Sequence, residues 1–283
     1  MLKIKELISP KDLPIITLED IQNNCFSKYL NTCFGIIIDD IIKRTGKVTD
    51  IYNNMSTNEN FVKTEYDIQN SLFSSLEKID YAMRFIESYE KKNYLKSDFI
   101  PFDKYAAYHY DVICHKVSTA KDSFLKITNQ TYNLGLGNRE CNWNNIKKKR
   151  CIIDNPFLFD LFEANDKLNS GIKNKRNDSS HEGVLKISSL HEIESYLWTS
   201  KANEVLAKFM PSNPNYERNS SEYSAQISLA KKKILEDCTI VRYNIFAITK
   251  SILCCQFAKL KYTVEQLLPS VDKRTTEILS QKD

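Results

Sequence analysis

Glycine and proline are scarce in this chain, with 6 and 7 among its 283 residues. Proteins built from many β-strands need tight turns, and tight turns depend on these two residue types. The scarcity therefore argues against an all-β fold. At this length the chain can bury a sizeable core, either as one large domain or as a domain with a helical extension.

The eight cysteines contain no C-x-x-C pair and no histidine at zinc-finger spacing. Several lie within apolar runs, where cysteine behaves as a small buried hydrophobic residue. We therefore expect no metal site and no cofactor. Free thiols without a signal peptide indicate a reducing, cytoplasmic compartment. A Gly-rich phosphate loop, a nucleophile elbow and a carboxylate metal cluster are also absent from the sequence, so these enzyme classes find no support.

Long uncharged hydrophobic runs are missing as well. The most apolar window, TIVRYNIFAITKSILCCQFA, is interrupted by Arg242 and Lys250. Charged side chains are costly inside a bilayer, so this window predicts a core helix and no membrane span. The net charge of +4 permits a nucleic-acid partner without requiring one, because such binding depends on local clustering of charge.

Capping residues and hydrophobic periodicity predict one helix after another. Thr17 can cap a helix with Asp20 in its first turn, and this helix should run to about Arg44, before Gly46. Residues 47–58 are polar and indicate a loop.

A long helix is expected from about residue 59 to residue 93, because apolar residues recur there at steps of three, four and seven. The residues of this stripe are Phe61, Ile68, Leu72, Leu76, Ile79, Met83 and Ile86. Pro101 begins the next helix, which ends near Gly135. Two long helices joined by a short loop should pack antiparallel, as in a bundle.

Three further helices complete the expected fold. A short one begins near Asn155, with Pro156 in its first turn, and an apolar-periodic one begins near Val184. A final long helix should run from about residue 222 to residue 262. The sequence therefore predicts an all-α fold without internal repeats.

One polar stretch differs from its surroundings. KNKRNDSSHEG, residues 173–183, places Arg176, Asn177 and His181 together, although the chain has only eight arginines and four histidines. The same stretch also carries the capping-box pattern, with Ser179 followed three residues later by Glu182. In that alternative the stretch is a plain helix start with ordinary surface residues.

The pattern Arg-Asn-x-x-x-His at 176–181 resembles the signature of HEPN-domain ribonucleases. These are compact all-α bundles found in toxin–antitoxin pairs, abortive-infection proteins, anticodon nucleases and RNA-targeting CRISPR effectors. The resemblance implies a HEPN-like antiparallel helical bundle at 59–262. An additional N-terminal helix would lie in an extension at 1–58, the bundle would end in the long C-terminal helix, and a charged tail would follow at 263–283.

The resemblance implies a metal-independent endoribonuclease that acts as a toxin or as an abortive-infection effector in phage defence. The RNA 2′-OH would attack the adjacent phosphorus and leave a 2′,3′-cyclic phosphate and a 5′-OH end. His181 can serve as acid or base near neutral pH. Arg176 can stabilise charge on the phosphoryl oxygens, and Asn177 can donate to the phosphate or hold the histidine.

The expected partners follow from the same resemblance. HEPN nucleases usually dimerise, which implies a homodimer with a composite active site, and an antitoxin or other regulatory partner is expected. One HEPN subgroup carries a tyrosine, modified by a partner nucleotidyltransferase, where this chain has Gly183. The resemblance therefore does not imply that pairing. On one helix, residues five apart lie about 140° around the axis, so we expect a kink or a helix start between Arg176 and His181.

Basic residues near the motif are candidates for RNA binding, because such runs attract a phosphate backbone. They are Lys173 and Lys175 before the motif, and Lys147, Lys148, Lys149 and Arg150 in the connector. A solvated charged face is the alternative interpretation. His109 and His115 are candidates for an accessory acid or base, and structural histidines are the alternative.

Two other classes of function also fit the sequence. A non-catalytic HEPN-like adaptor or binding protein would keep the shape without the chemistry, and altering His181 would leave its biological effect intact. An effector that senses phage or nucleotide signals through residues 1–58 would lose its regulation when those residues are removed.

Overall fold

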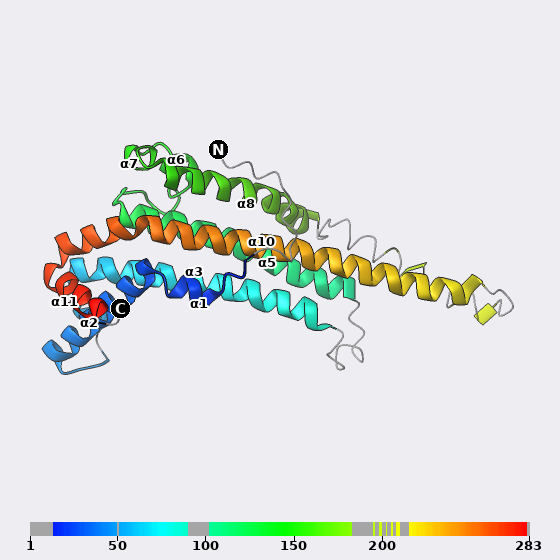
Figure 1. The fold of residues 1–283 in the computed structure, drawn as a ribbon, viewed down its shortest axis with the longest axis horizontal. Coiled ribbons are helices and arrows are strands. Elements are labelled where there is room, and N and C mark those ends of the chain that lie inside the picture. Colours follow the sequence, from blue (N-terminus) through cyan, green and yellow to red (C-terminus); the bar gives the residue numbers. More distant parts are fainter. Residues whose placement is uncertain are drawn as a thin grey trace. The chain divides into compact units, whose positions relative to one another are not determined.

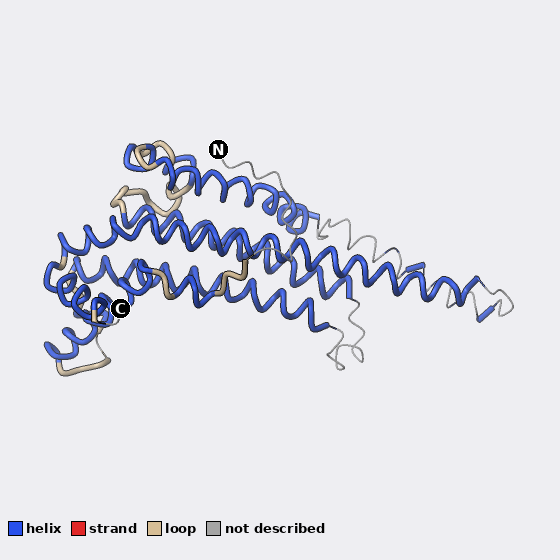
Figure 2. The backbone as a smooth tube through the Cα atoms, in the orientation of Figure 1, coloured by secondary structure: helices blue, strands red, loops and turns tan. Residues whose placement is uncertain are grey.

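The computed structural model describes residues 14–49, 51–89, 102–182 and 215–281, together with isolated positions between 195 and 209. Every regular element in these ranges is helical, and none of them contains a strand (Figures 1 and 2). The prediction of an all-α fold is therefore confirmed.

The helix expected from Thr17 to Arg44 is in fact two helices. The first, α1 (Leu18–Gln22), begins with a complete capping box. The Thr17 side chain accepts a hydrogen bond from the Asp20 amide at 3.1 Å, and the Asp20 carboxylate accepts one from the Thr17 amide at 2.8 Å.

The second of the two, α2 (Cys25–Thr45), begins at an asparagine cap. Asn24 accepts a hydrogen bond from the Ser27 amide at 2.9 Å, which favours a new helix start over continuation of α1. Gly46 ends α2 in the left-handed conformation, with φ of 67°, as its position in the sequence predicts.

Four long helices carry most of the structure. They are α3 (Thr57–Ser88), α5 (Phe102–Thr131), α8 (Pro156–Glu182) and α10 (Asn215–Leu267). The first two match the predicted periodicity closely. The other two are longer than expected, because α8 continues through the polar stretch after its start and α10 begins before residue 222. A 3-10 turn (Tyr52–Asn54) precedes α3, and the short helices α6 (Trp143–Ile146) and α7 (Arg150–Ile153) lie between α5 and α8.

The described chain divides into two compact units. The first unit takes its residues from 78–116 and 170–243, and the second from 15–77, 117–169 and 244–283. This division differs from the predicted one into 1–58, 59–262 and 263–283. The helices near the two ends of the chain belong to one unit with the middle of the sequence.

Helix α11 (Pro269–Ser280) occupies most of the segment in which the sequence predicts a charged tail. It packs on α2 and buries Val271 and Thr275. Arg274 binds Asp40 of α2 through a side-chain hydrogen bond of 2.9 Å. The Tyr29 hydroxyl donates to Asp272 at 2.6 Å. The charges of this segment therefore form intramolecular pairs, while its apolar residues enter the core.

Hydrogen bonds between helices show the relative directions of the long helices in the second unit. Gln256 of α10 donates to the Thr128 hydroxyl at 2.6 Å, and the Thr263 hydroxyl donates to the Thr131 carbonyl at 3.4 Å. From the first contact to the second, residue numbers increase along both helices, so α5 and α10 run parallel. Thr131 also donates to Glu65 near the start of α3 at 2.7 Å.

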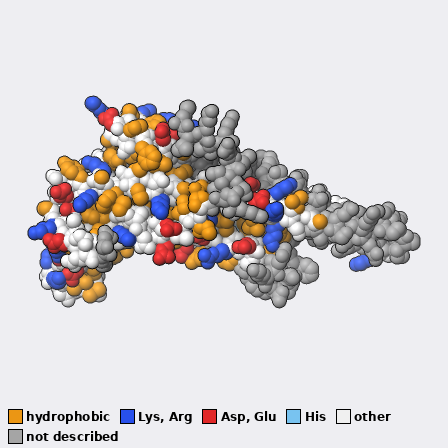
Figure 3. All heavy atoms as spheres, viewed as in Figure 1, with side chains coloured by type: hydrophobic (Ala, Val, Ile, Leu, Met, Phe, Trp, Pro, Cys, Tyr) orange, Lys and Arg blue, Asp and Glu red, His pale blue; other side chains and the backbone are white. Residues whose placement is uncertain are grey.

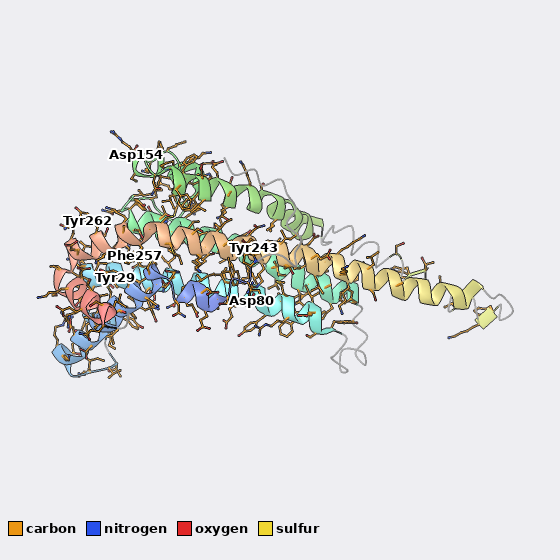
Figure 4. The ribbon with its side chains drawn as sticks, viewed as in Figure 1. Tyr29, Asp80, Asp154, Tyr243, Phe257 and Tyr262 are labelled. Atoms are coloured by element: carbon orange, nitrogen blue, oxygen red, sulfur yellow. The ribbon has the colours of Figure 1, made fainter. Side chains whose placement is uncertain are left out.

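The core of the second unit is aromatic and aliphatic. Tyr29 packs edge-on against Phe257, with ring centroids 5.7 Å apart (Figure 4). Phe124 and Phe246 are fully buried, and both belong to this unit. Each such side chain contributes about 1.5–3 kcal/mol relative to exposure.

The first unit repeats the same helix directions. Phe85 near the end of α3 stacks on His109 near the start of α5, at 5.0 Å between centroids. Tyr89, just after α3, packs against Tyr105 at 5.2 Å, so α3 and α5 are antiparallel in this unit, as predicted. Asp80 of α3, labelled in Figure 4, accepts hydrogen bonds from Nε and Nη2 of Arg242 in α10.

Residues Ser228–Leu267 of α10 are long and apolar enough to cross a membrane by length and composition, and a third of the most apolar window is buried. Ile245 and Ile252 in this stretch are fully buried, and Arg242 is paired with Asp80. These contacts place part of the stretch in the core of the described structure.

Candidate functional site

The Arg-Asn-x-x-x-His motif lies in the last two turns of α8, in the first unit. The helix is continuous from Pro156 to Glu182, so no helix begins at Ser179 and the capping-box interpretation is wrong. Its actual start is at Asn155, whose side chain accepts from the Leu158 amide at 3.2 Å. Asn, Asp and Ser each cost at most about 0.7 kcal/mol in a helix interior, too little to interrupt a helix already formed.

This continuity also removes the expected break between Arg176 and His181. The two residues lie about 140° apart around α8 and do not share one face. The side chains of the motif, and those of Lys173 and Lys175, lie outside the described part of the structure. The helix expected from Val184 begins outside it as well.

Helices α5 and α8 contact each other in the second unit. Lys121 binds Asp166 there, and the Tyr132 side chain lies beside Asn155, just beyond the end of α5 and just before the start of α8. The two helices are therefore antiparallel in this unit.

Asp111 is a carboxylate with unused hydrogen-bonding capacity. Its Oδ1 atom is buried and has no hydrogen-bond partner, while its Oδ2 atom lies 3.5 Å from Nε2 of His115. A buried oxygen without a donor is unfavourable by about 1–3 kcal/mol. A guanidinium is a suitable donor, because it presents several N–H groups in a planar fork. Asp111 therefore provides an acceptor atom in the unit that contains the motif.

The two candidate accessory histidines differ in their surroundings. The His115 side chain is 48% exposed and lies beside the Asp111 carboxylate, which can orient its ring for proton transfer. His109 is half-buried among aromatic rings, with Tyr105 at 4.4 Å and Tyr108 at 5.2 Å between centroids. The structure therefore favours a packing role for His109 and leaves His115 as the candidate for proton transfer.

The basic connector belongs to the second unit, whereas the motif belongs to the first. Lys148 and Arg150 are exposed, and Lys147 and Lys149 are half-buried beside α6 and α7. Arg150 lies 3.5 Å from Asp154 in an exposed i,i+4 pair, which is typical of a solvated helix surface. On the face drawn in Figure 3, charged side chains of both signs are interspersed with hydrophobic ones.

A shallow cavity of about 260 Å³ lies in the first unit between α3 and α10. Its lining residues are Asp80, Met83, Arg84, Glu87, Leu235, Thr239 and Arg242. Charges of both signs line it, and the pair formed by Asp80 and Arg242 occupies one wall. Across the described ranges, no three His, Cys, Asp or Glu residues are placed to hold a metal ion.

The sequence interpretation missed a buried polar layer in the second unit. Its side chains are fully buried: Glu65, Gln69, Thr128, Thr131 and Gln256. Burial raises the pKa of Glu65 to about 8, although the hydrogen bond from Thr131 acts in the opposite direction. The signal was present, since Glu65 and Gln69 occupy positions of the apolar stripe of α3.

Compared with protein-family models, with curated proteins and with solved structures, the chain matches none of them.

Proposed function

We propose that this chain is a metal-independent endoribonuclease with a HEPN-like bundle. The observation that supports the proposal most is the Asp111 carboxylate on α5, in the same unit as the motif, which has a buried oxygen without a hydrogen-bond partner and lies beside the exposed His115. A carboxylate that holds Arg176 also fixes the direction in which its guanidinium meets a phosphate. Asp111 is then a positioning residue for the charge-stabilising group.

In the proposed reaction the RNA 2′-OH attacks the adjacent phosphorus and the bond to the 5′-oxygen breaks. Arg176 stabilises the charge that develops on the phosphoryl oxygens. His181 accepts the 2′-OH proton or protonates the leaving oxygen, and Asn177 donates a hydrogen bond to the phosphate or to the histidine. The products are a 2′,3′-cyclic phosphate and a 5′-OH end.

A homodimer is part of the proposal. Arg176 and His181 lie on different faces of α8, and the reaction needs both a base and an acid. Two copies with facing motifs would supply both groups to one cleft. A role as toxin or abortive-infection effector, restrained by an antitoxin or another regulatory partner, fits such an activity.

Cleavage should persist in a chelator. Purified protein incubated with total RNA in EDTA should cut it and leave cyclic phosphate ends, because the attack uses the RNA's own 2′-OH and side-chain groups alone. Mapping the chemistry of the cut ends checks this. Strict dependence on added magnesium or manganese would contradict the mechanism.

The active species should be a dimer. Analytical ultracentrifugation across a dilution series should show a stable dimer at the concentrations where cleavage is measured. A chain that sediments as a monomer yet cleaves with a rate per protomer independent of concentration would rule out the composite cleft and leave each motif to act alone.

A further inference from the structure

Three aromatic side chains of the first unit are exposed to solvent on the facing ends of α3 and α5. Tyr81 is 47% exposed, Phe85 41% and Tyr108 68%. Rings of this size carry a large apolar surface and are mostly buried in folded proteins. Their concentration on one small surface therefore needs a physical explanation.

The exposed rings form one connected surface with His109, which we call the aromatic platform: Tyr81, Phe85, Tyr105, Tyr108 and His109. Tyr81 and Phe85 are neighbours one turn apart on α3. Phe85 stacks on the His109 ring at 5.0 Å and 30°, and Tyr105 and Tyr108 meet the same ring edge-on at 4.4 and 5.2 Å. These contacts hold the rings in place while their outer faces remain accessible.

Cations border the aromatic platform on both helices. Arg84 is exposed between Tyr81 and Phe85 on α3, and Lys104 is exposed one turn before Tyr108 on α5. Of the acidic residues nearby, Asp80 is bound by Arg242, which offsets its charge, and Glu87 is exposed on the next turn of α3. The border of the platform is therefore suited to a negatively charged backbone.

The residue types favour nucleobases over another protein. The large hydrophobic side chains exposed on the described ends of α3 and α5 are all aromatic, with no leucine, isoleucine or methionine among them. Aromatic rings flanked by cations are the arrangement that binds single strands, since bases stack on the rings and phosphates meet the cations. We propose that the aromatic platform binds unpaired bases of single-stranded RNA.

The platform also shares a face of α5 with Asp111 and His115, so this inference rests on the proposed function for its biological meaning. Lys104, Tyr108, Asp111 and His115 follow one another along one face of α5, at steps of four, three and four. Tyr108 and His115 are roughly 10 Å apart along the helix axis. A strand stacked on Tyr108 would pass directly by the pair formed by Asp111 and His115.

The test measures binding without cleavage. The probe is a short, dye-labelled, single-stranded RNA with 2′-O-methyl sugars, which cannot be cut by attack of a 2′-OH, and its affinity is read by fluorescence anisotropy. Tyr108→Ala should raise the Kd about tenfold, as expected for loss of one stacked base. Tyr108→Phe keeps the ring and should bind like the parent, and a duplex probe should be insensitive to both changes.

Phe157→Ala is the matched control, because Phe157 is an equally exposed aromatic residue at 59% on α8 in the second unit. It should leave the Kd unchanged. The proposal is overturned if the parent does not bind the probe, or if Tyr108→Ala and Phe85→Ala bind it as the parent does. Unchanged affinity combined with loss of the dimer on ultracentrifugation would identify the platform as a protein interface instead.

The two proposals fail separately in this design. If the parent cleaves RNA and Tyr108→Ala binds the probe normally, the platform proposal is wrong and the nuclease proposal stands. If the parent binds the probe through Tyr108 but does not cleave natural RNA, the platform proposal stands and the nuclease proposal is wrong.

Discussion

His181→Ala should lower the single-turnover rate of RNA cleavage on the order of a hundredfold or more, because it removes a general acid or base. Its stability should change by less than about 1 kcal/mol. His181 is the residue before the last one of α8. Because alanine is the best helix-forming residue, the substitution should leave the helical backbone unchanged. The measurement is cleavage at saturating protein beside a melting curve for each variant.

Ser179→Ala is the control for this experiment. It changes a residue of the same helix two positions away, inside α8, and should leave both the rate and the melting temperature unaltered. Arg176→Ala should reduce the rate more than it weakens RNA binding, since the charge it stabilises develops mainly in the transition state. A His181→Ala protein that melts and cleaves like the parent would remove the motif from the active site and favour the non-catalytic adaptor.

The parts of the fold that depend on local pattern could be predicted from the sequence. The apolar stripe of α3 gave limits close to Thr57–Ser88, and the cap at Thr17 and the end at Gly46 were both identified correctly. The break at Asn24 was missed because hydrophobic residues continue on both sides of it. Only the hydrogen bond to the Ser27 amide reveals the second start.

Contacts between residues far apart in the chain could not be predicted from the sequence. The segment after α10 is rich in charge and was expected to be a tail, yet Arg274 has a partner in Asp40, more than two hundred residues away in the chain. The ion pair between Lys121 of α5 and Asp166 of α8 depends in the same way on the register of two helices. No local pattern encodes such a register, because each helix alone satisfies the same periodicity.

Local patterns also misled at the motif. Ser179 and Glu182 match a capping box, but the helix that begins at Asn155 is already formed when the chain reaches them. Nothing between Pro156 and Glu182 is a proline, and the polar residues there tolerate a helical backbone. Arg176 and His181 therefore lie on different faces of one continuous helix. The proposed reaction then depends on a second copy of the chain to bring both groups to one cleft.

The buried layer of the second unit shows what polar residues in an apolar stripe can mean. Glu65 accepts a hydrogen bond from Thr131 on one oxygen, and its other oxygen has no partner. Gln69 and Gln256 each keep an amide oxygen without a partner as well. Burial without a paired cation raises the pKa of Glu65 to about 8, so the folded protein holds this carboxyl in its neutral form at pH 7.

Glu65→Gln should stabilise the protein near neutral pH. The pKa of this carboxyl is 4.5 in the unfolded chain and about 8 in the folded one. Between these values the folded state retains a proton that the unfolded state releases, so the parent loses stability as the pH rises from 4.5 towards 8. The loss should reach on the order of 3 kcal/mol at pH 7.

Glutamine has no proton to lose, and its amide oxygen can still accept from Thr131. Urea unfolding curves should therefore place the variant level with the parent near pH 4.5 and above it near pH 8. Glu277→Gln, at an exposed position of α11 in the same unit, should follow the pH dependence of the parent. If Glu65→Gln is instead the less stable protein near pH 8, the carboxyl is ionised in the folded state. A cation must then hold it within the bundle, because an unpaired buried charge would unfold the protein that contains it.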